Sequence, residues 1–379
     1  MLQANAFNRE LFNSDCILGR DVRTLFEARS ITDANEFAYR LWNKMHGAMT
    51  DAMTTWLVVY PLFRINSPSV SLGFDGLSLI CPTDPALWGQ ITTRYANAAQ
   101  WDPATEMPPY LQQNSGKGLP TWIVCEVRGT QRGAQQLAAR RIRTFLAVLF
   151  AHLYPNERSL LTKSAAAEFT YSQQFAIDGS RSTCRQAASF IGRLMPPLII
   201  DVELRPEMIV EVTEWYAKQA AADQDLRNRS LVATQFIGYG LVADELERFI
   251  HFFIGLDALF GEMKKVEARI VEGIRRTFVG DHTWDYRTPK LFDLRSSLVH
   301  GENISTGDWK ELDAYRGHIK SHPVRDVSTA VMTALRQYPN NYPPKSAAAT
   351  SSGNGVMVAC SLAFLVGALV GKIVWSARS

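Results

Sequence analysis

The sequence is poor in cysteine and lacks the short motifs of several enzyme classes. Its five cysteines are scattered, with no CxxC pair and an odd total, so they indicate neither a disulfide framework nor a zinc site, and they favour a reducing compartment. Neither a G-x-S-x-G nucleophile elbow nor an HExxH pair is present, which leaves out two familiar hydrolytic sites. We therefore predict no metal and no cofactor.

A strong excess of charge of one sign is also missing. The chain carries 40 Lys and Arg against 37 Asp and Glu, a formal net charge of +3. Any surface that binds phosphate groups must then be a local patch. The first residues do not combine a basic segment with an apolar one, so we expect no signal peptide.

Two stretches come close to nucleotide-binding motifs but fail in their context. Lys117 lies in "SGKG", which lacks the first glycine of a P-loop, and it is read as a solvated loop residue. The segment "GYGLVA", Gly238 to Ala243, matches GxGxxA, with Asp257 further on. A dinucleotide site needs that acid at the end of a strand, whereas here it lies in a helical pattern. We expect Gly238 and Gly240 to form an interhelical turn.

Long apolar runs are absent until the end of the chain. Residues 355–375 are almost continuously apolar, which is about the length that crosses a bilayer. The preceding residues 338–354 are rich in Pro, Ser, Ala and Gly and are typical of a flexible linker. These features predict a single-pass C-terminal transmembrane anchor, with the bulk of the chain cytoplasmic.

The rest of the chain predicts an α+β N-terminal domain, residues 1–200, followed by an all-α helical bundle, residues 205–337. Strands are expected where β-branched and aromatic residues gather, with a turn between Gly73 and Gly76: in the first half these are 54–65, 70–83, 121–130 and about 168–177. Helices are expected near 134–152 and then at 207–222, 228–239, 242–260, 265–278, 287–300, 308–320 and 324–337.

One short segment, "LFDLRSSLVHGEN" from Leu291 to Asn303, combines an arginine and a histidine at the end of a predicted helix. Leu291 and Leu294 lie on its apolar face, and Gly301 is a natural stop. His300 falls in the last turn, where the helix dipole favours a cationic side chain. The loose spacing Arg-x4–6-His recurs elsewhere in the chain, in Arg40 with His46, Arg276 with His282 and Arg316 with His322. The context, rather than the spacing, therefore singles out Arg295 and His300.

Such a pair suits phosphodiester cleavage without a metal. Arg295 would hold the scissile phosphate with its planar charged fork, and His300 would act as general base or acid. The reaction expected is attack by the RNA 2′-hydroxyl on its own phosphate. On an ideal helix the two side chains leave about 140° apart, so convergence needs the reach of arginine, distortion near Gly301, or a second copy across a dimer.

The same segment, preceded by "FIHFFIGLDALFG" and "EARIVEGIRRTF", resembles the ApeA-like branch of the HEPN superfamily over roughly residues 205–337. In that branch an LExL helix, an Arg-rich helix and YxxRSxxVHG follow in this order. The resemblance implies a compact helical bundle and a metal-independent endoribonuclease that leaves 2′,3′-cyclic phosphate ends. It also implies a homodimer with RNA as its partner. Similar proteins often act as toxins or in defence against phage.

Carried over by position, the resemblance makes Arg295 and His300 the catalytic pair and Ser296 the polar residue that supports them. Asp257 stands where the family has a glutamate, one methylene longer, so an orienting role for it is in doubt. The tyrosine expected before the motif is replaced by Phe292 or its neighbours.

The N-terminal domain has a weaker signal. The resemblance favours sensing or targeting, with a ligand that the sequence does not identify. Arginines gather in the helix near 134–152 and in the residues before it. They could line a path for RNA, or they could form the solvated basic face of an amphipathic helix. We favour the second interpretation. The arginines in question are Arg128, Arg132, Arg140, Arg141 and Arg143.

Two alternatives to a membrane-tethered ribonuclease stay open. In the first, the helical bundle is a non-catalytic dimerisation or RNA-binding module, and the protein is an adaptor or sensor at the membrane. In the second, the C-terminal apolar segment is itself the effector and perturbs the membrane.

Overall fold

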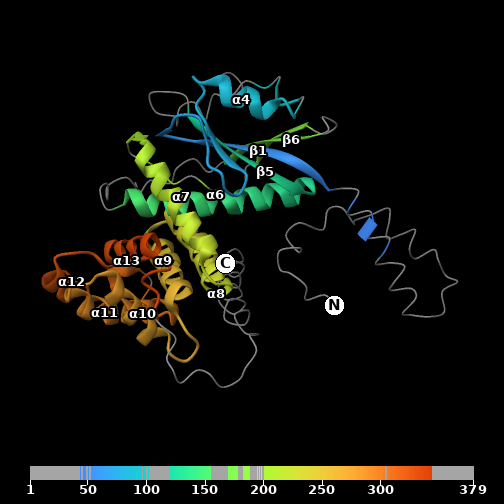
Figure 1. Ribbon diagram of the computed structural model, residues 1–379. Helices are drawn as coiled ribbons and strands as arrows, with labels where there is room; N and C mark the ends of the chain where they lie inside the picture. The colour runs from blue at the N-terminus through green and yellow to red at the C-terminus, as the bar shows by residue number, and fades with distance from the viewer. Residues whose placement is uncertain are drawn as a thin grey trace, which may run out of the picture. The chain divides into compact units, whose positions relative to one another are not determined.

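The chain contains an antiparallel sheet and a series of helices that pack against each other (Figure 1). The computed structural model describes residues 53–95, 97–99, 101, 120–154, 170–177, 182–187 and 201–343 except 304, and a few single positions between 43 and 200. By contacts between Cα atoms the chain divides into Met1–Tyr342 and Pro343–Ser379. The account below concerns the first of these units.

The sheet has six strands in the order β3-β4-β5-β1-β6-β7, and all neighbours are antiparallel. Its central pair, β1 and β5, is in register over the full length of both strands. Their bounds are β1 Thr54–Leu62, β3 Val70–Ser71, β4 Leu77–Ile80, β5 Thr121–Gly129, β6 Thr170–Ala176 and β7 Ser182–Ala187. A parallel pair, β2 Ile65–Asn66 and β8 Val202–Glu203, forms a separate two-stranded sheet.

Both faces of the central strands are buried, because side chains of successive residues point to opposite sides. Trp56 and Val58 of β1 pack in the core that contains helix α6 (Gln131–Leu153). Leu57 and Val59 pack on the other side with Trp88 and other aromatic residues of helix α4 (Pro85–Thr92) and the segment after it. A strand covered on both sides loses the polar–apolar alternation that a half-exposed strand shows.

From residue 206 onward the described chain is helical. Its helices are α7 Pro206–Ala221, α8 Gln224–Val242, α9 Glu245–Phe260, α10 Val266–Thr277, α11 Thr283–Val299, the short 3-10 helix η2 Thr306–Asp308, α12 Leu312–Ile319 and α13 Pro323–Gln337. The seven helices expected in this half are confirmed to within a few residues. The strands expected near 54–65, 70–83, 121–130 and 168–177 are also confirmed. The predicted turn lies between β3 and β4, where Gly73 and Gly76 have φ values of +72° and +65°. The helical segment α4 and the strands β7 and β8 were not predicted.

Helix α6 lies between the sheet and the later helices (Figure 1) and contacts β1, β5, α8 and α13. The Thr144 and Thr234 hydroxyls are 3.1 Å apart across α6 and α8. Arg143 is 7% exposed, and its guanidinium lies 4.3 Å from the ring centre of Tyr239. The expectation that the α6 arginines form a solvated basic face is therefore wrong for Arg143, because contact with α8 covers it.

Gly238 and Gly240 lie inside α8 and are buried, so the predicted interhelical turn is wrong. A Cβ at Gly238 would meet Arg143 Cγ at 2.1 Å, and one at Gly240 would meet the ring of Phe252 at 2.5 Å. The two glycines are needed because α8 is approached closely by α6 on one side and by α9 on the other. Glycine is unfavourable in a helix, and close packing is the compensation here.

The predicted membrane anchor requires a correction. Residues 355–375, which carried that prediction, lie outside the described residues. In the part of the chain that the structure describes, no helix is both long and apolar enough to span a bilayer. Helix α6 has 23 residues, but its sequence includes Arg132, Arg140, Arg141 and Arg143, whose charges are costly in hydrocarbon. The transmembrane helix in the predicted fold class and the predicted membrane localisation are therefore wrong for the described part of the chain.

Candidate functional site

The C-terminal end of α11 is built to stop at His300 and to leave its side chain exposed. Gly301 follows with φ of +77°, a conformation that glycine adopts without steric cost. Its N–H donates to the Leu298 carbonyl oxygen at 3.3 Å, and the Glu302 N–H donates to the Ser297 carbonyl oxygen at 2.9 Å. This pair of bonds closes the helix as a Schellman motif. His300 occupies the cap position, and its side chain is exposed.

Arg295 lies five residues, about 1.4 turns, before His300 on the same helix and is partly buried. It stands next to Leu294, which is fully buried with Leu291 and fixes the rotation of α11 about its axis. Ser296 is partly buried, and its carbonyl oxygen accepts the His300 N–H at 2.9 Å. The supporting role predicted for the Ser296 side chain stays a prediction.

Asp257 comes from the last turn of α9, and the fold brings it near Arg295. Burial raises the pKa of the Asp257 carboxyl above its ordinary value, while the charges of Arg295 and Arg229 act in the opposite direction. The helices are held together at this point by Phe253 and Phe292, whose rings meet edge-to-face with centroids 4.7 Å apart. Phe292 is the position where the resemblance expects tyrosine, and here the ring serves packing between α9 and α11.

The end of α9 leaves space for the Asp257 side chain because glycine follows. A Cβ at Gly261 would lie 1.8 Å from Asp257 Oδ1. The Gly261 N–H donates to the Asp257 carbonyl oxygen at 2.7 Å, and Arg229 Nη1 donates to the Gly261 carbonyl oxygen at 2.8 Å. The Asp257 carboxyl thus lies within electrostatic reach of Arg295 and Arg229, and no direct ion pair joins it to either within the described residues.

Arg295 and His300 differ from the other arginine–histidine pairs of similar spacing. Arg276 lies 3.6 Å from a Glu272 oxygen, and His282 lies 3.6 Å from an Asp285 oxygen. In contrast, no ion pair within 4.0 Å occupies Arg295 or His300 in the described part of the chain. The pair Arg40 and His46 begins outside the described residues. The charge of Arg295 is therefore partly compensated by Asp257 at longer range and stays available to an anion.

The structure brings Arg295 and Asp257 close enough for their charges to interact, and it places His300 at the exposed C-terminal end of α11. The angular separation expected between Arg295 and His300 is not removed by distortion, because α11 runs as a helix through Val299. Within the described residues no group of three or more His, Cys, Asp and Glu side chains is arranged to hold a metal.

The sequence reading missed a second cluster, at the opposite end of α11. A pocket there is lined by the residue that caps α11, by the first turns of α11 and by the end of α12. Its lining residues are His282, Thr283, Tyr286, Arg287, His318 and Ile319. Of these, His282 and Tyr286 share a helical i, i+4 spacing that the sequence displays. Residues 318 and 319 join them only through the fold.

The burial of the Asp257 carboxyl leads to a prediction about how the free energy of unfolding depends on pH. A carboxyl whose pKa is raised in the folded state binds its proton more readily when folded. Its contribution to stability is then present at acid pH and is lost as the pH rises through the carboxyl range. We expect Asp257→Asn to raise the free energy of unfolding at neutral pH and to change it little at a pH where the carboxyl is protonated, as measured by urea unfolding.

Asp313→Asn is the matched control, because Asp313 is an exposed acid in the first turn of α12. It should show no comparable difference between the two pH values. A loss of stability in Asp257→Asn at both pH values would contradict the prediction and would indicate that the charged carboxylate is a net structural support.

Comparison of the sequence with models of known protein families and with curated proteins gives no match, and comparison of the fold with solved structures gives none either.

Proposed function

We propose that the protein is a metal-independent endoribonuclease of the HEPN type, acting as a homodimer on RNA. The observation that supports this most is the arrangement at the end of α11. Arg295 lies beside Asp257 with no ion pair to a neighbour in the described residues, and His300 is exposed at the closed end of the same helix. An available guanidinium and an exposed imidazole are the two groups that cleavage through a 2′-hydroxyl needs.

In the proposed reaction the Arg295 guanidinium binds the non-bridging oxygens of the scissile phosphate. His300 accepts the proton of the 2′-hydroxyl as its oxygen attacks phosphorus. The bond from phosphorus to the 5′-oxygen breaks, and that oxygen takes a proton. The products are a 2′,3′-cyclic phosphate and a 5′-hydroxyl.

A second copy of the chain supplies what a single helix end lacks. In one copy Arg295 and His300 diverge, and one imidazole cannot be base and acid in the same step. Two helix ends facing each other across a dimer would bring a second His300 to protonate the leaving oxygen. Asp257 is a positioning residue in this scheme, since its charge acts on Arg295 rather than on the substrate.

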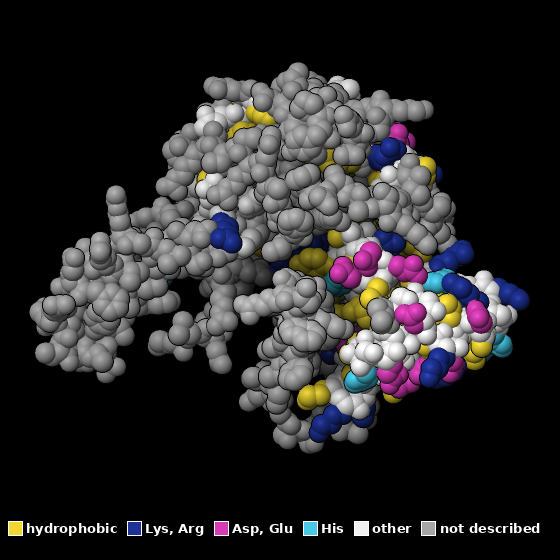
Figure 2. Space-filling model, turned by 180° about the vertical axis from the view of Figure 1, so that it is seen from behind, with side chains coloured by type: hydrophobic (Ala, Val, Ile, Leu, Met, Phe, Trp, Pro, Cys, Tyr) yellow, Lys and Arg dark blue, Asp and Glu magenta, His cyan; other side chains and the backbone are white. Residues whose placement is uncertain are grey.

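The charge distribution is compatible with local binding of phosphate rather than with a long basic track. Figure 2 shows one face of the molecule, on which acidic, basic and histidine side chains of the described residues are interspersed. Together with the formal net charge of +3, this favours contact with a few nucleotides near the site over extended electrostatic binding.

The proposal is tested with the full chain, a single-stranded RNA and an excess of EDTA. We expect fragments that end in 2′,3′-cyclic phosphate, and no cleavage at a position whose 2′-hydroxyl is replaced by hydrogen. Mass spectrometry of the fragments identifies the ends. Cleavage of the deoxy position, or complete loss of cleavage in EDTA, would contradict the mechanism. Binding of RNA without scission would favour the non-catalytic adaptor.

A further inference from the structure

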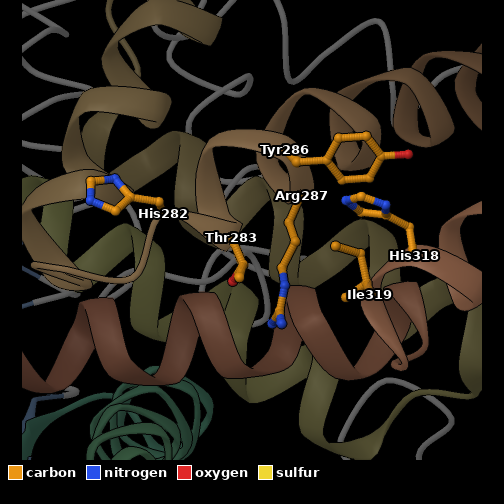
Figure 3. A pocket seen from close by; sticks show the side chains of 6 residues that line it. All are labelled: His282, Thr283, Tyr286, Arg287, His318 and Ile319. Atoms are coloured by element: carbon orange, nitrogen blue, oxygen red, sulfur yellow. The ribbon is translucent and has the colours of Figure 1, made fainter.

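The pocket at the N-terminal end of α11 is a surface hollow with the volume of a small-molecule site and a mixed aromatic and polar lining. Its volume is about 340 Å³, within the range of small-molecule sites. Figure 3 shows it from close by, between the first turns of α11 and the end of α12. It uses none of the residues assigned to cleavage.

Two rings form an exposed aromatic surface in this pocket. The centroids of Tyr286 and His318 are 4.5 Å apart, with an angle of 43° between the ring planes. Both side chains are exposed, and Tyr286 is one of the large apolar residues at the surface, at 36% exposure. In Figure 3 the two rings lie side by side. Exposed rings of this kind bind flat, unsaturated groups by stacking.

The charges around the pocket are already compensated. Arg287 Nη1 lies 3.3 Å from an oxygen of Asp326, a residue that is 3% exposed. In Figure 3 the Arg287 side chain extends away from the two rings. His282 lies 3.6 Å from Asp285. A free phosphate would therefore find little uncompensated positive charge here, whereas a neutral ring with hydrogen-bonding edges would find stacking partners and polar groups.

From this lining we infer that the pocket binds a nucleobase by stacking on Tyr286 and His318. The inference rests on the proposed function in one respect, namely that the base belongs to the RNA whose phosphate is held at Arg295. Tyr286 and His300 are fourteen residues apart on α11, which places them about 21 Å apart along the helix axis and within about 40° of the same helix face, whereas Arg295 lies on the opposite face from Tyr286.

A strand of a few nucleotides can connect these two points, but it does not run straight along the helix. Trp309 Nε1 donates to Asp293 Oδ2 at 3.2 Å, so the segment after η2 covers the intervening turn of α11. The strand passes around this segment. The pocket thus serves as a distant subsite that selects and orients single-stranded RNA, while cleavage takes place at the other end of the helix.

The test measures binding without cleavage. The full chain carrying His300→Ala is titrated against a short fluorescent single-stranded RNA, and fluorescence anisotropy gives the dissociation constant. Adding Tyr286→Leu is expected to raise this constant about ten-fold, because stacking of one base is worth about 1–3 kcal/mol. Adding Tyr286→Phe keeps the ring and should change the constant less than about two-fold, on the same stacking argument. Thermal unfolding confirms that the variants are folded.

Arg316→Ala is the matched control for charge, because Arg316 is exposed on α12 but does not line the pocket. It should leave binding nearly unchanged. Equal binding of the Tyr286→Leu and Tyr286→Phe variants would overturn the inference. Equal weakening by Arg316→Ala and Tyr286→Leu would overturn it too, since attraction would then be electrostatic only.

Further measurements distinguish a base that belongs to RNA from one that belongs to a free nucleotide. They also distinguish failure of the stacking site from failure of the proposed ribonuclease. If adenosine and uridine monophosphates bind as tightly as the RNA and lose affinity with Tyr286→Leu, the base comes from a free nucleotide, and the stacking site stands. If wild-type protein cleaves RNA but Tyr286→Leu leaves binding unchanged, the subsite fails alone. If binding depends on Tyr286 but wild-type protein does not cleave RNA in EDTA, the proposed ribonuclease fails and the base site remains.

Discussion

Replacement of His300 by alanine is expected to lower the rate of RNA cleavage by at least about two orders of magnitude, the smaller end of what proton transfer by a positioned side chain contributes. The helix should remain intact, since His300 is exposed and its backbone N–H, not its side chain, closes the turn on the Ser296 carbonyl oxygen. The rate is measured under single-turnover conditions, with enzyme in excess over a labelled RNA. Binding of the same RNA, measured separately, should fall much less than the rate.

The control for this variant is His46→Ala, since His46 is an exposed histidine far away in the sequence. Its cleavage rate should equal that of the wild-type protein. Mixed dimers give a second check: if each active site uses His300 from both copies, a dimer with one wild-type subunit loses most of its activity rather than half. A His300→Ala protein that cleaves at the wild-type rate would remove this residue from the mechanism.

The parts of the fold that the sequence predicts are those with strong local signals. Runs of β-branched and aromatic residues predict β1 and β5. Apolar spacing of three and four residues predicts α9, and Phe249, Phe253 and Leu256, which follow this spacing, are buried. The end of α11 is also predictable, because glycine after an apolar segment has one common structural meaning. Local patterns of this kind do not depend on what the segment later packs against.

The parts that the sequence does not predict are set by contacts between distant segments. Gly238 and Gly240 look like a turn until α6 and α9 are seen to press against α8 at these two residues. Arg143 looks like a surface charge until Tyr239 covers it. The approach of Asp257 to Arg295 is a further case: the resemblance supplies both positions, but only the packing of α9 on α11 shows that their charges interact.

Loss of the Asp326 side chain is expected to destabilise the fold strongly. It is 3% exposed and accepts hydrogen bonds from the Tyr315 hydroxyl at 2.6 Å and the Ser321 hydroxyl at 2.8 Å. Arg287 Nη1 lies 3.3 Å away and is its partner in charge. Asp326→Ala would leave the Arg287 charge in a largely buried position without that partner. We expect the free energy of unfolding to fall by about 3–5 kcal/mol, the usual cost of breaking a buried ion pair, as measured by urea unfolding.

Two further variants decide whether unpaired charge is the cause. Asp313→Ala removes an exposed acid from the first turn of α12 and should cost no more than about 1 kcal/mol, the value of a surface charge near a helix start. The double variant Arg287→Met with Asp326→Leu removes both charges and should be more stable than Asp326→Ala, because replacing a buried ion pair by apolar residues is often neutral. If the double variant is less stable than Asp326→Ala, the unpaired Arg287 charge is not the main cause of the loss in Asp326→Ala, since both variants lack the hydrogen bonds that Asp326 accepts from Tyr315 and Ser321.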